Sequence, residues 1–154
     1  MQSDKYLVIN IRDVFQENGA SKEREKKMFE TLLSFSCPYN QNVEKFLKEQ
    51  SVEFTKKNQS VTYLVFLKED ATLVGYFTLA SKPIEVKSNL FSKSIQRKIS
   101  RVSEYNQEHQ VFHLSAYLIA QLGKNFKEGA NKKITGQELL MIARNQRMGD
   151  GLDI

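Results

Sequence analysis

Length, composition and charge exclude several classes of protein. The chain has 154 residues, of which 40% are hydrophobic and 27% charged, so we expect one globular domain over residues 1–154 without a membrane-spanning segment or a signal peptide. It contains one cysteine, Cys37, and therefore no internal disulfide, which fits a cytoplasmic protein, and its net charge of +5 favours an anionic partner.

The first part of the chain predicts a strand and two helices. Residues 5–15 are rich in β-branched and aromatic side chains and are typical of a strand. Apolar residues at helical spacing predict a helix from Ser21 to Phe35, with Ser21 as its N-cap. Pro38 and neighbouring asparagines indicate a turn and a cap, and a second helix is expected from Val43 to about Lys57.

A β-hairpin is expected next. Two apolar runs, Thr62–Leu67 and Thr72–Ala80, flank a short polar turn. Gly75 within the second run indicates a β-bulge or a close approach of another backbone segment.

The last third predicts a basic helix, a strand and a final helix. Within residues 81–109, Ile95, Ile99 and Val102 repeat at helical spacing among lysines and arginines, which indicates a short amphipathic helix with loops on either side. Val111–Leu122 is apolar on both faces over its second half, as in a central strand, and a helix follows from about Gly136 to Asn145. This order of elements predicts an α+β fold with a largely antiparallel sheet.

The segment between Leu122 and Gly136 has two interpretations. A helix start carries unpaired N–H groups and a partial positive charge, and nearby Lys124, Lys127, Lys132 and Lys133 favour an anion such as phosphate. Alternatively, Thr135 and Glu138 form a capping box, T-x-x-E, at an ordinary helix start. The two interpretations are compatible if the Glu138 carboxylate turns aside.

The order of elements and two motifs resemble the GNAT family of N-acetyltransferases. "LVGYFTLA" is similar to the second hairpin strand of that family, "AYLIAQL" to its central strand and "ITGQELL" to its Gly-x-x-Leu-Leu helix start, with Gly136 as the matching glycine. The resemblance implies a twisted, mostly antiparallel sheet flanked by helices, the acyl-CoA N-acyltransferase fold.

The sequence also departs from that pattern. Asn131 stands where the family has Arg or Gln, Ile134 replaces a loop glycine, and the loop is longer than usual. The further strands and helix that follow in the family have no counterpart here, so the chain resembles a bacterial member with a degenerate cofactor loop and missing C-terminal elements.

The resemblance implies acetyl-CoA as the cofactor and residues that would hold it. The family's central strand and its following loop supply that site, which here corresponds to Ala120, Gln121, Leu122, Lys124, Asn131, Lys132, Lys133, Ile134, Thr135, Gly136 and Gln137. The family's frequent tyrosine acid lies in the part without a counterpart. Tyr76 and Tyr117 are more typical of packing residues, so the catalytic residues stay unassigned.

Other candidate residues carry weaker signals. His109 and His113 lie about 13 Å apart if extended and lack further ligands, so no metal site is expected. Cys37 has no identifiable base. The basic segment from Lys82 to Arg101 is the best candidate for binding nucleic acid, although a solvated helix face explains it better.

Three hypotheses follow. The first is transfer of an acetyl group from acetyl-CoA to an amine on a small-molecule or macromolecular acceptor. The second is a truncated, non-catalytic GNAT-like fold, whose uncovered sheet edge would favour a homodimer. The third is a basic protein associated with nucleic acid, and family relatives that act as toxins on charged transfer RNA would combine the first and the third.

Overall fold

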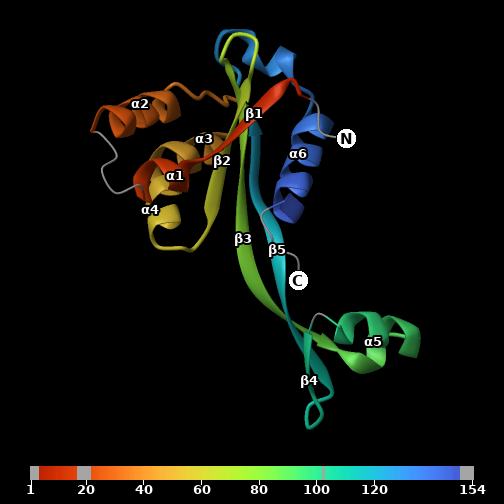
Figure 1. The fold of residues 1–154 in the computed structure, drawn as a ribbon. Coiled ribbons are helices and arrows are strands. Elements are labelled where there is room, and N and C mark those ends of the chain that lie inside the picture. The colour runs from red at the N-terminus through yellow and green to blue at the C-terminus, as the bar shows by residue number, and fades with distance from the viewer. Residues whose placement is uncertain (1–3, 17–21, 102, 150–154) are drawn as a thin grey trace.

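One five-stranded antiparallel sheet forms the framework of the molecule (Figure 1). The computed structural model describes residues 4–16, 22–101 and 103–149. The strands are β1 (Tyr6–Asn10), β2 (Val61–Leu67), β3 (Leu73–Lys87), β4 (Ser103–Asn106) and β5 (Val111–Lys124), in the spatial order β1-β2-β3-β5-β4. The expected α+β class with an antiparallel sheet is therefore confirmed.

Helices cover both faces of the upper part of this sheet (Figure 1). One face carries α1 (Ile11–Gln16), α2 (Lys22–Leu33), α3 (Gln41–Lys45) and α4 (Ser51–Lys56), with a π-helical turn at Phe46–Gln50 between the last two. The other face carries α6 (Gly136–Gly149). None of the described helices is both long and apolar enough to cross a membrane.

The predicted N-terminal strand is shorter than expected. It ends at Asn10, and residues 11–16 form α1 instead. The Asn10 carboxamide oxygen accepts a hydrogen bond from the Arg12 amide at 2.9 Å, which is how an asparagine caps a helix start. This local cap outweighs the β-propensity of Ile11, Val14 and Phe15, whose side chains pack into the core from the helix.

The two predicted helices in the following segment are confirmed. The helix α2 ends two residues before Phe35, and the proposed cap Ser21 lies outside the described residues. Asn40 caps α3 by accepting from the amides of Asn42 and Val43.

Two hydrophobic clusters sandwich the sheet. On the face covered by α1–α4, Phe35, Leu47 and Tyr76 are fully buried. On the face covered by α6, Phe77 and Leu139 are buried. Burial at both faces explains why β2 and the first half of β3 read as nearly continuous apolar runs.

The predicted hairpin is confirmed, and its second strand is longer than expected. The β2–β3 register places Val65 opposite Gly75 and Phe66 opposite Leu73, so Val74 is an extra residue that forms a bulge. A Cβ atom on Gly75 would lie 2.8 Å from the Gly123 carbonyl oxygen. Both sequence interpretations of this glycine therefore apply.

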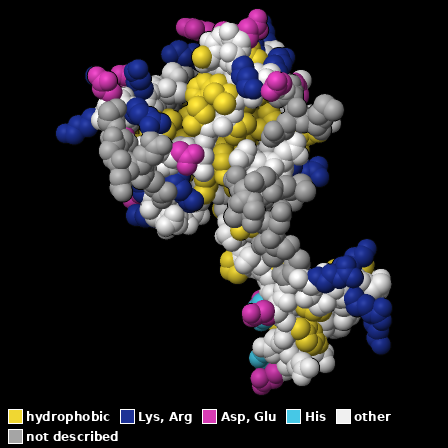
Figure 2. Space-filling model, viewed as in Figure 1, with side chains coloured by type: hydrophobic (Ala, Val, Ile, Leu, Met, Phe, Trp, Pro, Cys, Tyr) yellow, Lys and Arg dark blue, Asp and Glu magenta, His cyan; other side chains and the backbone are white. Residues whose placement is uncertain are grey.

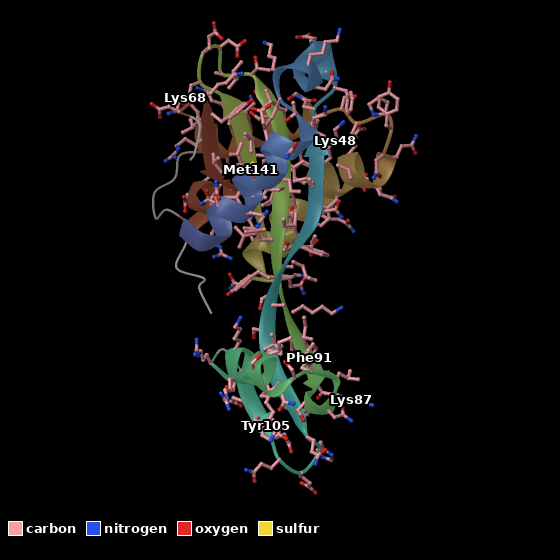
Figure 3. The ribbon with its side chains drawn as sticks, turned by 90° about the vertical axis from the view of Figure 1, so that its right-hand side faces the viewer. Lys48, Lys68, Lys87, Phe91, Tyr105 and Met141 are labelled. Atoms are coloured by element: carbon pink, nitrogen blue, oxygen red, sulfur yellow. The ribbon has the colours of Figure 1, made fainter. Side chains whose placement is uncertain are left out.

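Strands β3 and β5 continue beyond the helices into a protruding arm (Figures 1 and 3), defined here as residues 82–116. Only Ser88 and Phe112 are buried among its described residues. The expected basic helix is α5 (Lys93–Ser100), and Val102 lies outside the described residues. The prediction of loops on either side of this helix was wrong, because residues 81–87 continue β3 and residues 103–106 form β4.

The second half of β5 is an edge and not the central strand that the sequence predicted. The short strand β4 pairs only with residues 111–114 of β5. From Ser115 to Lys124, β3 is the only strand that pairs with β5 within the described part of the chain. The apolar side chains of this half cover the sheet faces, while one row of its backbone groups lacks a strand partner.

Candidate functional site

A bulge interrupts β5 where the sequence predicted cofactor contacts. Gln121 pairs with Thr78 and Ile119 with Leu79, so Ala120 has no counterpart in β3. Such bulges occur at sheet edges and next to active sites. The structure thus places the first three predicted residues, Ala120 to Leu122, at a distortion of an edge strand.

Backbone groups of β5 point outward beyond this bulge. The Asn125 amide donates to the Val74 carbonyl at 2.9 Å, which fixes the alternation of the β3–β5 ladder. By that alternation, the N–H and C=O groups of Leu122 and Lys124 face away from β3. An extended chain that carries amide groups can pair with them as a strand would.

Asn125 anchors the loop that follows β5. Its side chain is 4% exposed and accepts from the amides of Ser36 and Lys127, while its amide nitrogen donates to the Leu73 carbonyl. Sequence reasoning missed this residue, although an asparagine directly after a strand is a recognisable turn signal. The loop therefore leaves the sheet in one fixed direction.

The loop itself is a tight 3₁₀ segment, Lys127–Lys133. Glu128 and Gly129 adopt left-handed conformations with φ of 52° and 77°. Ala130 and Ile134 are buried, and the Ile134 side chain packs in the cluster under α6. Ile134 thus contributes to the core, and its side chain is not available to a ligand.

The capping box at the start of α6 is formed. The Thr135 hydroxyl accepts from the Glu138 amide and the Glu138 carboxylate accepts from the Thr135 amide, both at 3.0 Å. The other Glu138 oxygen accepts from the Tyr6 hydroxyl at 3.1 Å, so this carboxylate is turned toward β1. The amides of Gly136 and Gln137 have no acceptor within the described part of the chain, and a Cβ on Gly136 would meet open space.

These contacts shift two pKa values. The hydrogen bond from the Thr135 amide lowers the pKa of Glu138. Burial, together with the hydrogen bond to Glu138, raises the pKa of Tyr6 to about 12. Glu138 is therefore an anion and Tyr6 a neutral donor at neutral pH.

One of the four predicted lysines is engaged by an acidic side chain of another turn. Lys133 pairs with Asp70 of the β2–β3 turn at 2.6 Å and also contacts Thr72, which lowers the pKa of Asp70 to about 2. Lys132 is exposed and Asn131 and Lys124 are half-buried. The positive charge near the amides of Gly136 and Gln137 is thus smaller than the sequence suggested.

The two candidate tyrosines have different environments. Tyr76 is fully buried and its hydroxyl donates to the Val43 carbonyl at 2.6 Å; burial raises its pKa. Tyr117 is half-buried and lines a pocket. Tyr76 is therefore a packing residue, as the sequence analysis favoured.

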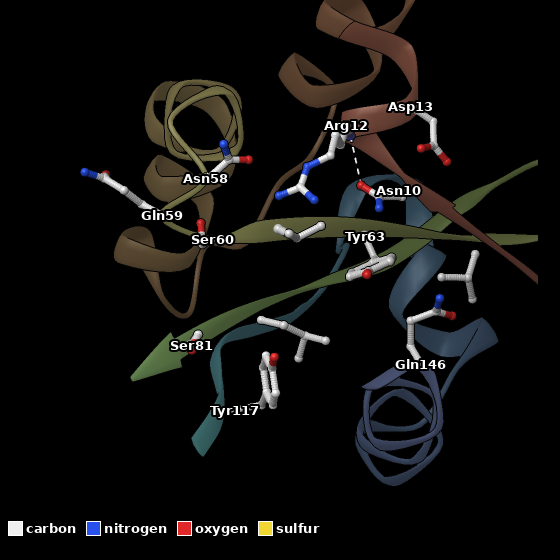
Figure 4. Close-up of a pocket in the computed structure, with 13 residues that line it drawn as sticks. Asn10, Arg12, Asp13, Asn58, Gln59, Ser60, Tyr63, Ser81, Tyr117 and Gln146 are labelled. Carbon is white, nitrogen blue, oxygen red and sulfur yellow. Dashed lines mark hydrogen bonds between the residues drawn. The ribbon is translucent and has the colours of Figure 1, made fainter. Parts of the chain in front are cut away.

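A pocket of about 560 Å³ lies on the face of the sheet covered by α6 (Figure 4). Four separate segments meet there: the β1–α1 junction, the α4–β2 loop, the β3–β5 pair and the last turns of α6. Its polar lining includes Asn10, Arg12, Asn58, Ser60, Tyr117 and Gln146. Sequence reasoning missed this pocket, because no motif links residues so far apart in the chain.

No metal site is found among the described residues, where no three His, Cys, Asp or Glu side chains are placed to hold an ion. His113 pairs with Glu85 across β5 and β3 at 3.4 Å, and His109 lies in the turn before β5. Cys37 is buried.

The arm carries a one-sided positive charge (Figure 2). Lys93, Arg97, Lys98 and Arg101 are exposed along α5, and none of them forms an ion pair with a described residue. Beside them, Tyr105 is 45% exposed. A surface hollow of about 410 Å³ joins this ring to Lys93 and Arg97.

Comparison with known proteins finds similarity in structure and not in sequence. No protein-family model matches the chain, and no curated protein matches it by sequence. AtaT complexed with acetyl-methionyl-tRNAfMet matches with a TM-score of 0.58 and 16% identity, over 96% of this chain and 72% of that chain.

Two variant structures match in the same way. A tyrosine-to-phenylalanine mutant of the AtaT toxin gives a TM-score of 0.56 at 13% identity, over 99% of this chain and 70% of that one. A tyrosine-to-phenylalanine mutant of KacT gives a TM-score of 0.55 at 17% identity, over 98% of this chain and 74% of that one. At these identities the similarity establishes the fold, and this chain has the GNAT-like α+β architecture that AtaT and KacT share.

Proposed function

We propose that this chain transfers an acetyl group from acetyl-CoA to an amine. The observation that carries the proposal is the bulged, unpaired edge of β5, which leads through a fixed loop to a helix start with two unused amides. The GNAT-like fold supports the same reaction class. When bound, acetyl-CoA supplies the acetyl thioester.

The chain's own groups would bind and orient this cofactor. The outward backbone groups of Leu122 and Lys124 suit the amides of the pantetheine arm. The amides of Gly136 and Gln137 suit a phosphate oxygen, because they lie at the positive end of the α6 dipole. The proposed site also includes Ala120 and Gln121 of the same strand, and Asn131, Lys132, Lys133 and Thr135 of the segment that leads to α6. Both oxygens of the Glu138 carboxylate, which would repel phosphate, already accept hydrogen bonds from the protein, one from the Tyr6 hydroxyl and one from the Thr135 amide.

Replacing Gly136 tests the phosphate position. Gly136→Pro removes one unused N–H at the first position of α6, where proline is tolerated, so stability should be unchanged. We expect the affinity for coenzyme A to fall about tenfold, because one charge-assisted hydrogen bond is lost. Gly136→Ala keeps the N–H and should bind normally. Isothermal titration with coenzyme A measures the affinity of each variant.

Two outcomes would reject this part of the proposal. Equal affinity of both Gly136 variants would place the phosphate elsewhere. No binding of coenzyme A to the unaltered chain at about millimolar concentration, detected as the absence of a thermal shift, would favour the non-catalytic alternative, whose homodimer is then testable by light scattering.

The exposed cations of α5 favour RNA as the carrier of the acceptor amine. Unpaired lysines and arginines beside an exposed aromatic ring are typical of surfaces that bind phosphates and stack bases. The AtaT complex contains acetyl-methionyl-tRNAfMet, an acetylated aminoacyl group on an RNA. The exposed helix face that the sequence analysis favoured as merely solvated thus gains a candidate ligand.

Salt dependence tests this second proposal. Arg97→Gln with Lys98→Gln should reduce the slope of log affinity against log salt by about 1.4 to 1.8 for a transfer RNA, since each lost phosphate contact contributes about 0.7 to 0.9. Lys26→Gln with Lys27→Gln on α2 removes the same charge elsewhere. Equal slopes in the two double variants would reject α5 as the RNA surface.

A further inference from the structure

The pocket in Figure 4 contains polar groups that the protein itself leaves without partners. In the described part of the chain, three buried side-chain polar atoms make no hydrogen bond: Arg12 Nε, Thr55 Oγ1 and Ser60 Oγ. Two of the three, those of Arg12 and Ser60, belong to residues that line this one pocket. Buried polar groups are nearly always paired, so this coincidence calls for a ligand or solvent partner.

The two side chains approach the pocket from different elements. Arg12 extends from the start of α1 toward the α4–β2 loop that carries Ser60 (Figure 4). Ser60 is 7% exposed, and Arg12 is half-buried. The backbone amide of Arg12 is held by Asn10, which fixes the base of the side chain while the guanidinium stays available.

The charge of Arg12 determines the kind of ligand. A guanidinium is always protonated and only donates hydrogen bonds, and Arg12 forms no ion pair with a described residue. A serine hydroxyl can donate beside it. Planar guanidinium groups bind the oxygens of carboxylates and phosphates in pairs.

The remaining lining restricts the size and charge of that ligand. The volume of about 560 Å³ lies within the range of small-molecule pockets and exceeds what a bare ion needs. Val8, Val61 and Leu79 add apolar surface, and Asp13 adds one negative charge. A small organic molecule with a single oxyanion group therefore fits better than a polyanion.

We propose that this pocket binds the oxyanion group, phosphate ester or carboxylate, of a small organic molecule through Arg12 and Ser60. None of the lining residues belongs to the proposed acetyl-CoA site. The proposal therefore stands or falls independently of acetyl transfer.

Titration of the full chain tests it with two kinds of probe. Adenosine 5′-monophosphate represents phosphate esters and butyrate, with one carboxylate, represents carboxylates, each compared with sodium chloride at equal ionic strength. We expect at least one of the two to raise the melting temperature in a saturable manner at about 10 mM or below. The better probe identifies the source of the oxyanion.

Substitutions of Arg12 test whether the probe binds in this pocket. Arg12→Gln should weaken binding of the effective probe by about tenfold or more, and Arg12→Lys by less, because the charge remains without the planar fork. Arg144→Gln on α6 removes an exposed charge that does not line the pocket and should leave binding unchanged.

Ser60→Ala adds a signature that a purely structural role would not give. It should weaken binding a few-fold without lowering the melting temperature of the ligand-free protein, because the hydroxyl has no protein partner. The buried Ser51 hydroxyl donates to the Leu47 carbonyl at 2.6 Å. Ser51→Ala should therefore lower the melting temperature of the ligand-free protein and leave binding of the probe unchanged. Failure of both probes, or binding that survives Arg12→Gln, would show a solvated pocket only and overturn the proposal.

Discussion

The Tyr76 hydroxyl illustrates how single residues fix the fold around the site. It donates to the Val43 carbonyl from a fully buried position, and its ring packs edge-on against Phe35 at 5.2 Å. Burial raises its pKa, so it remains a neutral donor at neutral pH. This one contact connects β3 to the start of α3.

Tyr76→Phe should therefore act on stability and not on chemistry. We expect the free energy of unfolding to fall by about 1 to 2 kcal/mol, because the buried Val43 carbonyl loses its donor. Urea denaturation monitored by circular dichroism measures this. Undiminished stability together with loss of acetyl transfer would instead assign Tyr76 a catalytic role.

Glu138 gives the helix start a pH dependence. Its pKa is lowered from 4.5 by the Thr135 amide, so its charge stabilises the fold above the unfolded pKa and this contribution is lost as pH falls through the folded value. Glu138→Gln should cost about 0.5 kcal/mol at neutral pH and nothing in acid. Unfolding curves across this range measure the difference, and an equal cost of Glu138→Gln at every pH would contradict it.

Close packing between elements leaves room only for glycine at Gly123. A Cβ atom there would lie 2.3 Å from Val43 Cγ1 of α3. Gly123→Ala should destabilise the protein by about 1 to 3 kcal/mol. Combining it with Val43→Ala should cost less than the sum of the single changes, as measured by a double-mutant cycle. Strict additivity would contradict the contact.

Elements marked by apolar runs, by helical spacing of apolar residues or by a local cap were predictable, and the solvated strands of the arm were not. The hairpin, α2, α5 and the Thr135–Glu138 capping box were expected for these reasons. The arm half of β3 contains Pro83 and charged residues exposed on both faces, so it lacks that alternation. The start of α1 depended on one cap, Asn10, within a segment of high β-propensity.

At the scale of the whole molecule, the arm and the body differ in how much they bury. The arm is held mainly by the β3–β5 ladder and buries only Ser88 and Phe112 within its described part. Few buried contacts permit local opening at low free energy. We expect amides of residues 82–87 to exchange with deuterium much faster than those of residues 61–67, as measured by mass spectrometry. Equal protection would contradict this difference.

The candidate site depends on this overall arrangement more than on motifs. The resemblance in sequence located the loop and the helix start, which are local. It could not locate the unpaired edge of β5 or the pocket beside Arg12, because both depend on which strands end where and on residues distant in the chain. Lys133 shows the same limit, since its partner Asp70 lies in another turn.

The extra residue at Ala120 has a consequence for insertions and deletions in this strand. Ile119 and Leu122, three positions apart, both pack against the cluster under α6, which strict alternation would forbid. Removing Ala120 would leave Ile119 and Leu122 two positions apart, so a regular strand without the bulge would still aim both at α6 and Gly123 at Val43. Natural variation should therefore tolerate the loss of one residue at this position, whereas one residue lost elsewhere in the strand would turn Leu122 away from α6.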